Sequence, residues 1–133
     1  MVATSAGPVA AAPAAVSTDD DLRDYFGRRW PEFFVGPDKH QELFQRLRFS
    51  LSPYQAAFGR ELPKYDLRPA VQKLAVPTLL IVGSEAHYKP DMEWLAQELP
   101  HVSLHVFPNV GHFPFVEAAD AFLQTVSEFL SHR

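Results

Sequence analysis

The side chain in this sequence best suited to proton transfer is the histidine at position 112. It stands between Gly111 and an apolar run made of Phe113, Pro114 and Phe115. An imidazole changes its charge close to neutral pH, so it can act as a general base, and apolar neighbours can keep water away from it. A loop histidine by itself is more often a surface residue. The flanking residues make His112 the candidate catalytic base.

Glu85 is a candidate carboxylate partner for that imidazole. It follows the apolar run 79–82 and the glycine at position 83. A carboxylate bonded to a catalytic imidazole fixes its tautomer and its orientation. Glu85 is therefore the candidate acid, and His87 beside it is interpreted as an exposed loop residue.

A nucleophile for this base is missing from the sequence. No serine stands in a Gly-x-Ser-x-Gly elbow, and the oxyanion donors that such an elbow provides are missing with it. Ser84 lies in the loop of the candidate acid. Ser5 has a glycine two residues after it, but Pro8 stands where a helix should begin. The sequence has no cysteine either, which excludes a thiolate nucleophile.

No metal and no cofactor is predicted. His101 and His105 are four residues apart in a predicted strand, which separates them by roughly 13 Å and makes them poor partners in one metal site. The aromatic residues of the first half recur at helical spacing, so they are interpreted as packing rather than as a cofactor surface.

Composition excludes several classes of partner. The sequence has 12 Lys plus Arg against 16 Asp plus Glu and no basic tract, which argues against nucleic-acid binding. The opening residues 1–16 are apolar but contain no Lys or Arg and are interrupted by proline, so they are expected neither to be a secretory signal nor to span a membrane. A cytoplasmic location is the expectation.

The second half of the sequence predicts a βαβα unit. Strands are expected at 79–82 and 103–107, and helices at 90–99 and 118–131. The buried stripe of the last helix is expected to consist of Phe122, Val126, Phe129 and Leu130. The first of these strands is a continuous apolar run, which is typical of a parallel strand covered on both faces. Alternating strands and helices indicate an α/β fold.

The first half predicts three helices. The first begins after Ser17 and Thr18, where acidic residues follow a capping residue, and the others begin near 37 and 52. The third is expected to end before Pro63. A short helix capped by Asp66 is expected to end near 74.

Two segments, 76–83 (VPTLLIVG) and 109–117 (NVGHFPFVE), together resemble the end of an α/β-hydrolase. In that family the first is a central parallel strand followed by the catalytic acid, and the second presents the catalytic histidine. The histidine segment is similar to that of proline-iminopeptidase-like and related carboxylic-ester hydrolases. The resemblance covers about 65–130 and extends more weakly through the helices before it.

This resemblance implies a fold class: α/β, the C-terminal portion of an α/β-hydrolase fold with a helical cap and an incomplete parallel sheet. Residues 1–16 are then a residual strand at 2–5 with a flexible Ala/Pro connection, 17–64 a helical cap-like segment, and 65–133 the C-terminal βαβα part of the core. The family commonly has an aspartate three residues after the glycine that ends the strand, and here Ala86 occupies that position. The resemblance makes Glu85 the substitute for this acid, but Glu85 is one residue earlier, so its side chain should leave the loop in a different direction.

Two functions follow from the resemblance. The chain is expected to be a fragment or remnant of a serine-type hydrolase of ester or amide bonds, which contributes His112 and the cap and is inactive alone. The alternative is a non-catalytic binding or interaction module derived from the same fold. A small-molecule ester, amide or peptide substrate is expected if the site is complemented, together with self-association or a partner chain that covers the open sheet.

Overall fold

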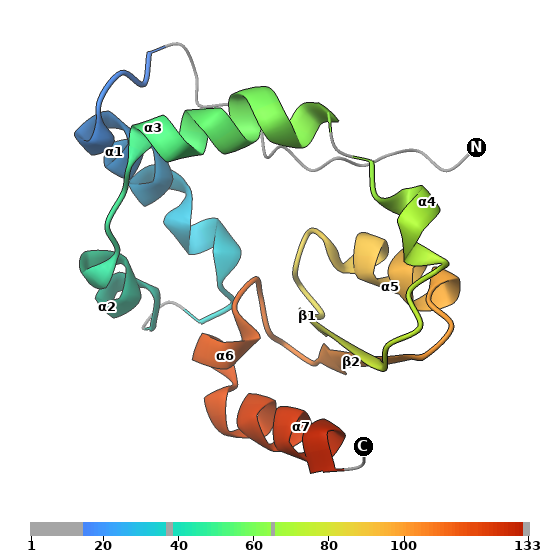
Figure 1. Cartoon of the computed structure of the whole chain (residues 1–133). Coiled ribbons are helices and arrows are strands. Elements are labelled where there is room, and N and C mark those ends of the chain that lie inside the picture. The colour runs from blue at the N-terminus through green and yellow to red at the C-terminus, as the bar shows by residue number, and fades with distance from the viewer. Residues whose placement is uncertain (1–14, 37–38, 65, 132–133) are drawn as a thin grey trace.

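The computed structural model describes residues 15–36, 39–64 and 66–131 of the chain. The strand expected at 2–5 lies outside the described residues. Figure 1 shows the helices of the first half on one side of the molecule and a small sheet with its helix on the other, and the C-terminal helices lie between and below them.

The helical segment, defined here as residues 17–64, begins with α1 (Asp19–Arg29). The predicted cap is confirmed, because Thr18 Oγ1 accepts the N–H of Asp21 at 3.0 Å and the Asp21 carboxylate accepts the N–H of Thr18 at 2.9 Å. Hydrogen bonds that Ser17 donates to this carboxylate, and then those with Thr18, lower the pKa of Asp21 to about 2. A 3₁₀ turn, η1 (Trp30–Phe33), continues α1.

Two more helical runs complete this segment. One is α2 (Lys39–Arg46), and the other is α3 (Leu51–Tyr54), which continues as the π-helical η2 (Gln55–Glu61) and the 3₁₀ turn η3 (Leu62–Lys64). The third helix therefore runs on through Pro63, where an end was expected. Proline is tolerated here because a 3₁₀ turn follows the widened helix.

The helical runs are joined by one small apolar cluster and by polar ties. Val16, Leu22 and Leu51 are buried together. The Asp19 carboxylate accepts the N–H of Leu51 at 2.7 Å, and the guanidinium of Arg23 donates to the carbonyl of residue 47 at 2.9 Å. These bonds hold α1, α3 and the loop after α2 together.

The predicted βαβ unit is confirmed. After the short α4 (Arg68–Val71), the chain forms β1 (Thr78–Gly83), α5 (Lys89–Glu98) and β2 (Val102–Phe107). The two strands are parallel, with Leu80 opposite Leu104. The N-cap of α4 is Leu67, without a side-chain cap, rather than the expected Asp66. Asp66, one residue earlier, accepts the N–H of Arg68 at 3.1 Å, and hydrogen bonds from this arginine lower the pKa of the Asp66 carboxyl to about 2.

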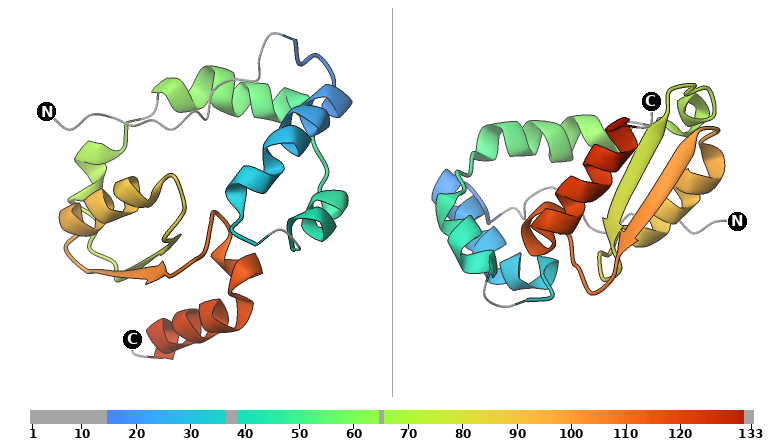
Figure 2. Two further views of the ribbon diagram at one scale, coloured as in Figure 1. Left: turned by 180° about the vertical axis from the view of Figure 1, so that it is seen from behind. Right: turned by 90° about the horizontal axis from the view of Figure 1, so that it is seen from below.

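The chain then forms α6 (Pro114–Glu117) and α7 (Ala119–Ser131). In Figure 2 α5 lies against one face of the sheet and α7 lies on its other side. No helix in the described part of the chain is long and apolar enough to cross a bilayer.

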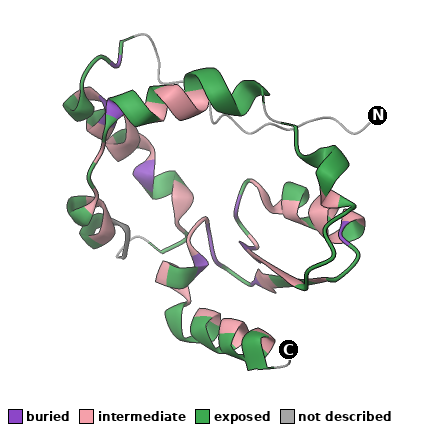
Figure 3. Cartoon of the chain, viewed as in Figure 1, coloured by how far each residue is buried: buried purple, intermediate pink, exposed green. Residues whose placement is uncertain are grey.

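Burial is lower than the sequence predicts. Of β1, Val82 and Gly83 are buried, whereas Thr78 to Ile81 are only half-buried. Leu130, expected in the buried stripe of α7, is 56% exposed, and Leu123 on the same helix is 61% exposed. Figure 3 shows how few residues are buried. The physical reason is that two strands, in the part of the chain that is described, form too narrow a surface to cover these apolar faces.

Candidate active site

The loops after the two parallel strands meet at the carboxyl ends of β1 and β2. The N–H of Glu85 donates to the carbonyl of Val110 at 3.0 Å, and the N–H of Asn109 donates to Ser84 Oγ at 2.9 Å. Asn109 has φ 55°, a left-handed conformation that asparagine tolerates better than most residues. These bonds fix the histidine loop against the loop of the candidate acid.

Two glycines make this contact possible. A Cβ at Gly83 would overlap the carbonyl oxygens of Val110 and Gly111, and a Cβ at Gly111 would overlap the carbonyl of Phe33. The backbone of the histidine loop therefore lies directly on the end of β1 and on η1. Only glycine leaves space for both approaches.

His112 is held by its backbone and surrounded by rings. Its N–H donates to the carbonyl of Phe33 at 2.7 Å, and its carbonyl accepts the hydroxyl of Tyr88 at 3.0 Å. The imidazole stacks on His87 with 5.3 Å between ring centroids, and it meets Tyr88 and Phe113 edge to face at 4.8 and 4.6 Å. The imidazole is thus enclosed by rings from two loops, while its backbone is bonded to η1 and to Tyr88.

The surroundings of His112 disfavour its charged form. Burial is the main cause that lowers the pKa of His112, and the neighbouring charge of His87 lowers it further. Burial also raises the pKa of the Tyr88 hydroxyl. Nδ1 of His112 is buried and has no hydrogen-bond partner in the described part of the chain. A neutral imidazole is the form that accepts a proton.

We expect His112 to titrate below the ordinary histidine value of 6.5 in the folded chain. The unfolded chain then binds more protons in the window between the folded pKa and 6.5, so stability is complete above 6.5 and falls as the pH drops through the folded pKa. NMR titration of the imidazole measures the pKa directly. His112→Gln should flatten the stability profile in that window, whereas His101→Gln, on an exposed turn, should not. A signal that titrates at or above 6.5 contradicts the expectation.

Glu85 lies on the neighbouring loop but does not contact the imidazole. Its side chain is exposed, and its carboxylate accepts the hydroxyl of Ser84 at 2.9 Å. Ala86, at the position where the resemblance implies an aspartate, is 6% exposed. The contact between the two loops therefore brings the backbone of Glu85 against the histidine loop. The carboxylate of Glu85 is bonded to Ser84 and not to the imidazole.

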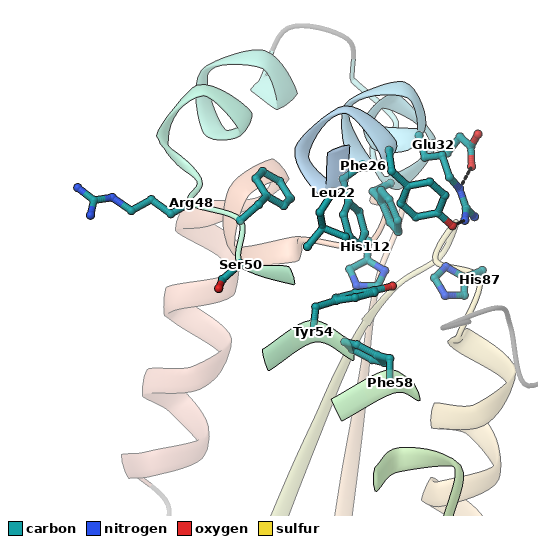
Figure 4. A pocket seen from close by; sticks show the side chains of 13 residues that line it. Leu22, Phe26, Glu32, Arg48, Ser50, Tyr54, Phe58, His87 and His112 are labelled. Carbon is teal, nitrogen blue, oxygen red and sulfur yellow. Dashed lines mark hydrogen bonds and ion pairs between the residues drawn. The ribbon is translucent and has the colours of Figure 1, made fainter. Parts of the chain in front are cut away.

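A pocket of about 610 Å³ separates the helical segment from these loops. His87 and His112 line one side (Figure 4), and the remaining lining residues come from the helical segment. Most of these are apolar or aromatic, namely Leu22, Tyr25, Phe26, Phe33, Phe49, Tyr54 and Phe58, and the others are Arg29, Glu32, Arg48 and Ser50. The pocket can therefore hold an apolar group with its reacting end at the imidazole.

One polar cluster interrupts the apolar lining. The guanidinium of Arg29 donates to the Tyr25 hydroxyl at 2.9 Å and pairs with Glu32 at 3.6 Å. The bond with Tyr25 is the main cause that raises the pKa of Arg29. This cluster places charged side chains at one part of the pocket lining.

Sequence reasoning missed three contributors to the site. His87 is exposed, as expected, but it also stacks on His112 and lines the pocket. Tyr88 and the carbonyl of Phe33 bind the backbone of His112. The adjacency of His87 and Tyr88 to Glu85 was a usable signal, whereas nothing local marks Phe33. Over the described ranges, no cluster of three or more histidine, aspartate or glutamate side chains could hold a metal ion.

The proteins to which this chain is similar are hydrolases. It is 35% identical over 108 residues to 2-hydroxy-6-oxononadienedioate/2-hydroxy-6-oxononatrienedioate hydrolase 2 of Pseudomonas putida, over 71% of this chain and 37% of that protein. It is 35% identical over 60 residues to a pimeloyl-(acyl-carrier protein) methyl ester esterase of Nitrosomonas europaea, over 44% of this chain and 24% of that protein. No family model matches the chain.

Solved structures show the fold. An esterase from Exiguobacterium antarcticum superimposes with a TM-score of 0.71 and 24% identity, over 84% of this chain and 44% of that one. The chain therefore has an α/β-hydrolase fold, present in part as helices and a small two-stranded parallel sheet, and the predicted fold class is confirmed. It spans only 37% and 24% of the length of these two curated relatives. The proline-iminopeptidase-like subtype stays a prediction.

Proposed function

We propose that this chain supplies the base and the cap of a serine-type α/β-hydrolase site that cleaves ester or amide bonds. His112 is the general base in this proposal, and residues 17–64 are the cap over the pocket. The nucleophile comes from polypeptide outside these 133 residues, because no Gly-x-Ser-x-Gly segment occurs in them.

The observation that carries the proposal is the position of His112. Its imidazole lies at the wall of a pocket lined with aromatic rings, at the carboxyl ends of two parallel strands. Open α/β sheets bind their ligands at those strand ends. The lowered pKa of His112 supports the same role, because the imidazole stays neutral and ready to accept a proton at neutral pH.

The pocket supports a substrate class. Its apolar lining suits an acyl or aromatic group, and the named hydrolase and methyl ester esterase relatives support cleavage of a small acyl compound. We propose a small ester or amide whose apolar part lies among Leu22, Phe26 and Tyr54, with its carbonyl beside His112.

The chain alone is expected to show no esterase or aminopeptidase turnover above that of His112→Ala. A base without a nucleophile and without oxyanion donors cannot form an acyl-enzyme intermediate. Release of p-nitrophenol from short acyl esters, followed over hours, is the measurement. Turnover that is lost in His112→Ala and is blocked by a serine-directed phosphonate would show that a nucleophile is present after all.

A non-catalytic binding module is the second candidate, and the acid position favours it. Ala86 stands there, and Glu85 is bonded to Ser84 rather than to His112. A module of this kind would bind apolar acids or esters in the pocket without turning them over. The measurement is the affinity for a fluorescent fatty acid. An affinity that falls in Phe26→Ala but is unchanged in His112→Ala favours this candidate. Coding sequence for a Gly-x-Ser-x-Gly segment in the flanking DNA favours the first.

The isolated chain is expected to self-associate. Phe115, Leu123 and Leu130 are each more than half exposed on α6 and α7, and within the described residues each strand pairs on one edge alone. Unpaired strand edges and apolar faces drive association at about 25 cal/mol for each Å² reburied. Sedimentation at low micromolar concentration should give a dimer or larger species, and Leu123→Glu should reduce it more than the control Leu67→Glu. A stable monomer with a cooperative thermal transition contradicts this expectation and favours the binding module.

A further inference from the structure

The carboxylate of Glu117 joins two parts of the chain that are distant in sequence. One oxygen, Oε1, accepts the N–H of Gly111 at 2.7 Å. The other, Oε2, accepts the N–H of Val35 at 2.7 Å and that of Gly36 at 3.4 Å. Gly111 belongs to the histidine loop, and Val35 and Gly36 follow η1 in the helical segment. Glu117 therefore connects the two walls of the pocket.

A second connection runs beside the first. The N–H of His112 donates to the carbonyl of Phe33 at 2.7 Å, and Gly111 lies so close to that carbonyl that a Cβ would overlap it. The stretch 33–36 thus contacts 111–112 through one direct bond and through the carboxylate of Glu117. A single carboxylate that accepts N–H groups from both stretches fixes their relative position.

Glu117 is held where it can make these bonds. It ends the short α6, in which its N–H donates to the carbonyl of Phe113 at 3.1 Å and Pro114 is buried. Both of its oxygens accept backbone N–H groups, so it does not provide the carboxylate that Nδ1 of His112 lacks. Its role differs from that of the catalytic acid.

We propose that Glu117 is a positioning residue that fastens the end of the cap to the histidine loop and so sets where His112 lies in the pocket. The cap and the histidine loop then move as one unit at this point. The part of the proposal that concerns His112 as a base rests on the proposed function, whereas the connection itself does not.

The test compares Glu117→Gln with Glu93→Gln in the full chain. A glutamine keeps the size of the side chain, but its NH₂ group faces one set of backbone N–H donors, so the bond to one side is lost. Glu93 makes a surface ion pair with Lys89 at 3.2 Å and serves as the matched control. Amide hydrogen exchange by NMR is measured at Val35, Gly36 and Gly111, and the imidazole of His112 is titrated in the same samples.

Glu117→Gln is expected to accelerate exchange at Val35 or Gly111 by about tenfold or more, the size expected when a charge-assisted bond is lost. The His112 signal should shift, and its pKa should rise toward 6.5 as the loop becomes better solvated. Glu93→Gln should change neither the amide exchange rates nor the titration of His112. The proposal is overturned if the amide exchange rates and the titration of His112 are both unchanged in Glu117→Gln.

The unsubstituted chain provides a second test if Glu117→Gln does not fold. Val35 and Gly111 should then exchange with the same protection, because one opening event exposes both, and a fast Val35 beside a protected Gly111 overturns the proposal. Failure of the proposed function leaves these readings in place, since none of them depends on turnover. The proposed function and the proposed role of Glu117 can therefore be refuted separately.

Discussion

Ala86→Asp is expected to raise the turnover of a reconstituted hydrolase by about 10²- to 10⁴-fold, when the chain is combined with the nucleophile-bearing part of a related enzyme. The upper figure is the loss measured when the aspartate of a serine-protease triad is replaced by asparagine. Nδ1 of His112 is buried without a partner in the described residues, and Ala86 stands three residues after Gly83, where the family commonly has its acid. An aspartate there should fix the tautomer of the imidazole and stabilise its protonated form.

Ala86→Asn is the matched control, since it adds the same volume without the charge and should leave turnover low. The isolated chain gives an independent reading, because an aspartate beside His112 should raise the pKa of the imidazole, whereas burial lowers it now. If the combined enzyme is equally active with and without the Ala86→Asp substitution, another carboxylate is the working acid. Glu85→Gln then identifies whether it is Glu85.

Gly83→Ala is expected to destabilise the chain by about 3 kcal/mol or more, toward the upper end of the range for overpacking. A Cβ at this position would overlap two backbone oxygens, those of Val110 and Gly111, and neither can rotate away as a side chain could. The histidine loop would have to leave the end of β1, so the bond from Glu85 N–H to the Val110 carbonyl should be lost as well.

Urea unfolding measures this effect, with Gly36→Ala as the control. A Cβ at Gly36 meets nothing within 4 Å and the residue has no positive φ, so this substitution should change stability by about 0.5 kcal/mol or less. Equal stabilities of the two variants would mean that the histidine loop does not rest on Gly83. The His112 signal should shift in Gly83→Ala and stay in place in Gly36→Ala.

Local signals in the sequence were enough to predict most elements. Ser17 and Thr18 with the acidic residues after them predicted the start of α1, and apolar runs bounded by proline and glycine predicted β1 and the α/β fold. These features follow from neighbours within a few residues, where capping, backbone freedom and side-chain periodicity act directly. The segment around His112 identified the histidine loop in the same way, although its role in a reaction stays a prediction.

Burial needed the tertiary structure. The periodicity of α7 predicted its apolar face, and Phe122, Val126 and Phe129 are indeed half-buried, but Leu130 is exposed. A pattern within one helix shows which side is apolar, and it carries no information on whether another element covers that side. Whether the apolar side of α7 is covered depends on the number of strands beside β1 and β2.

The sequence by itself determined which residue can act as a base, because residue type and the strand before it are local properties. Only the tertiary structure decided what holds that residue: the carbonyl of Phe33 on its N–H, the ring of His87 on its imidazole, and Glu117 between its loop and Val35. Phe33 and Val35 are about 80 residues away from the groups they contact. Hydrogen bonds over that separation form when the whole chain packs, and no spacing within either segment encodes them.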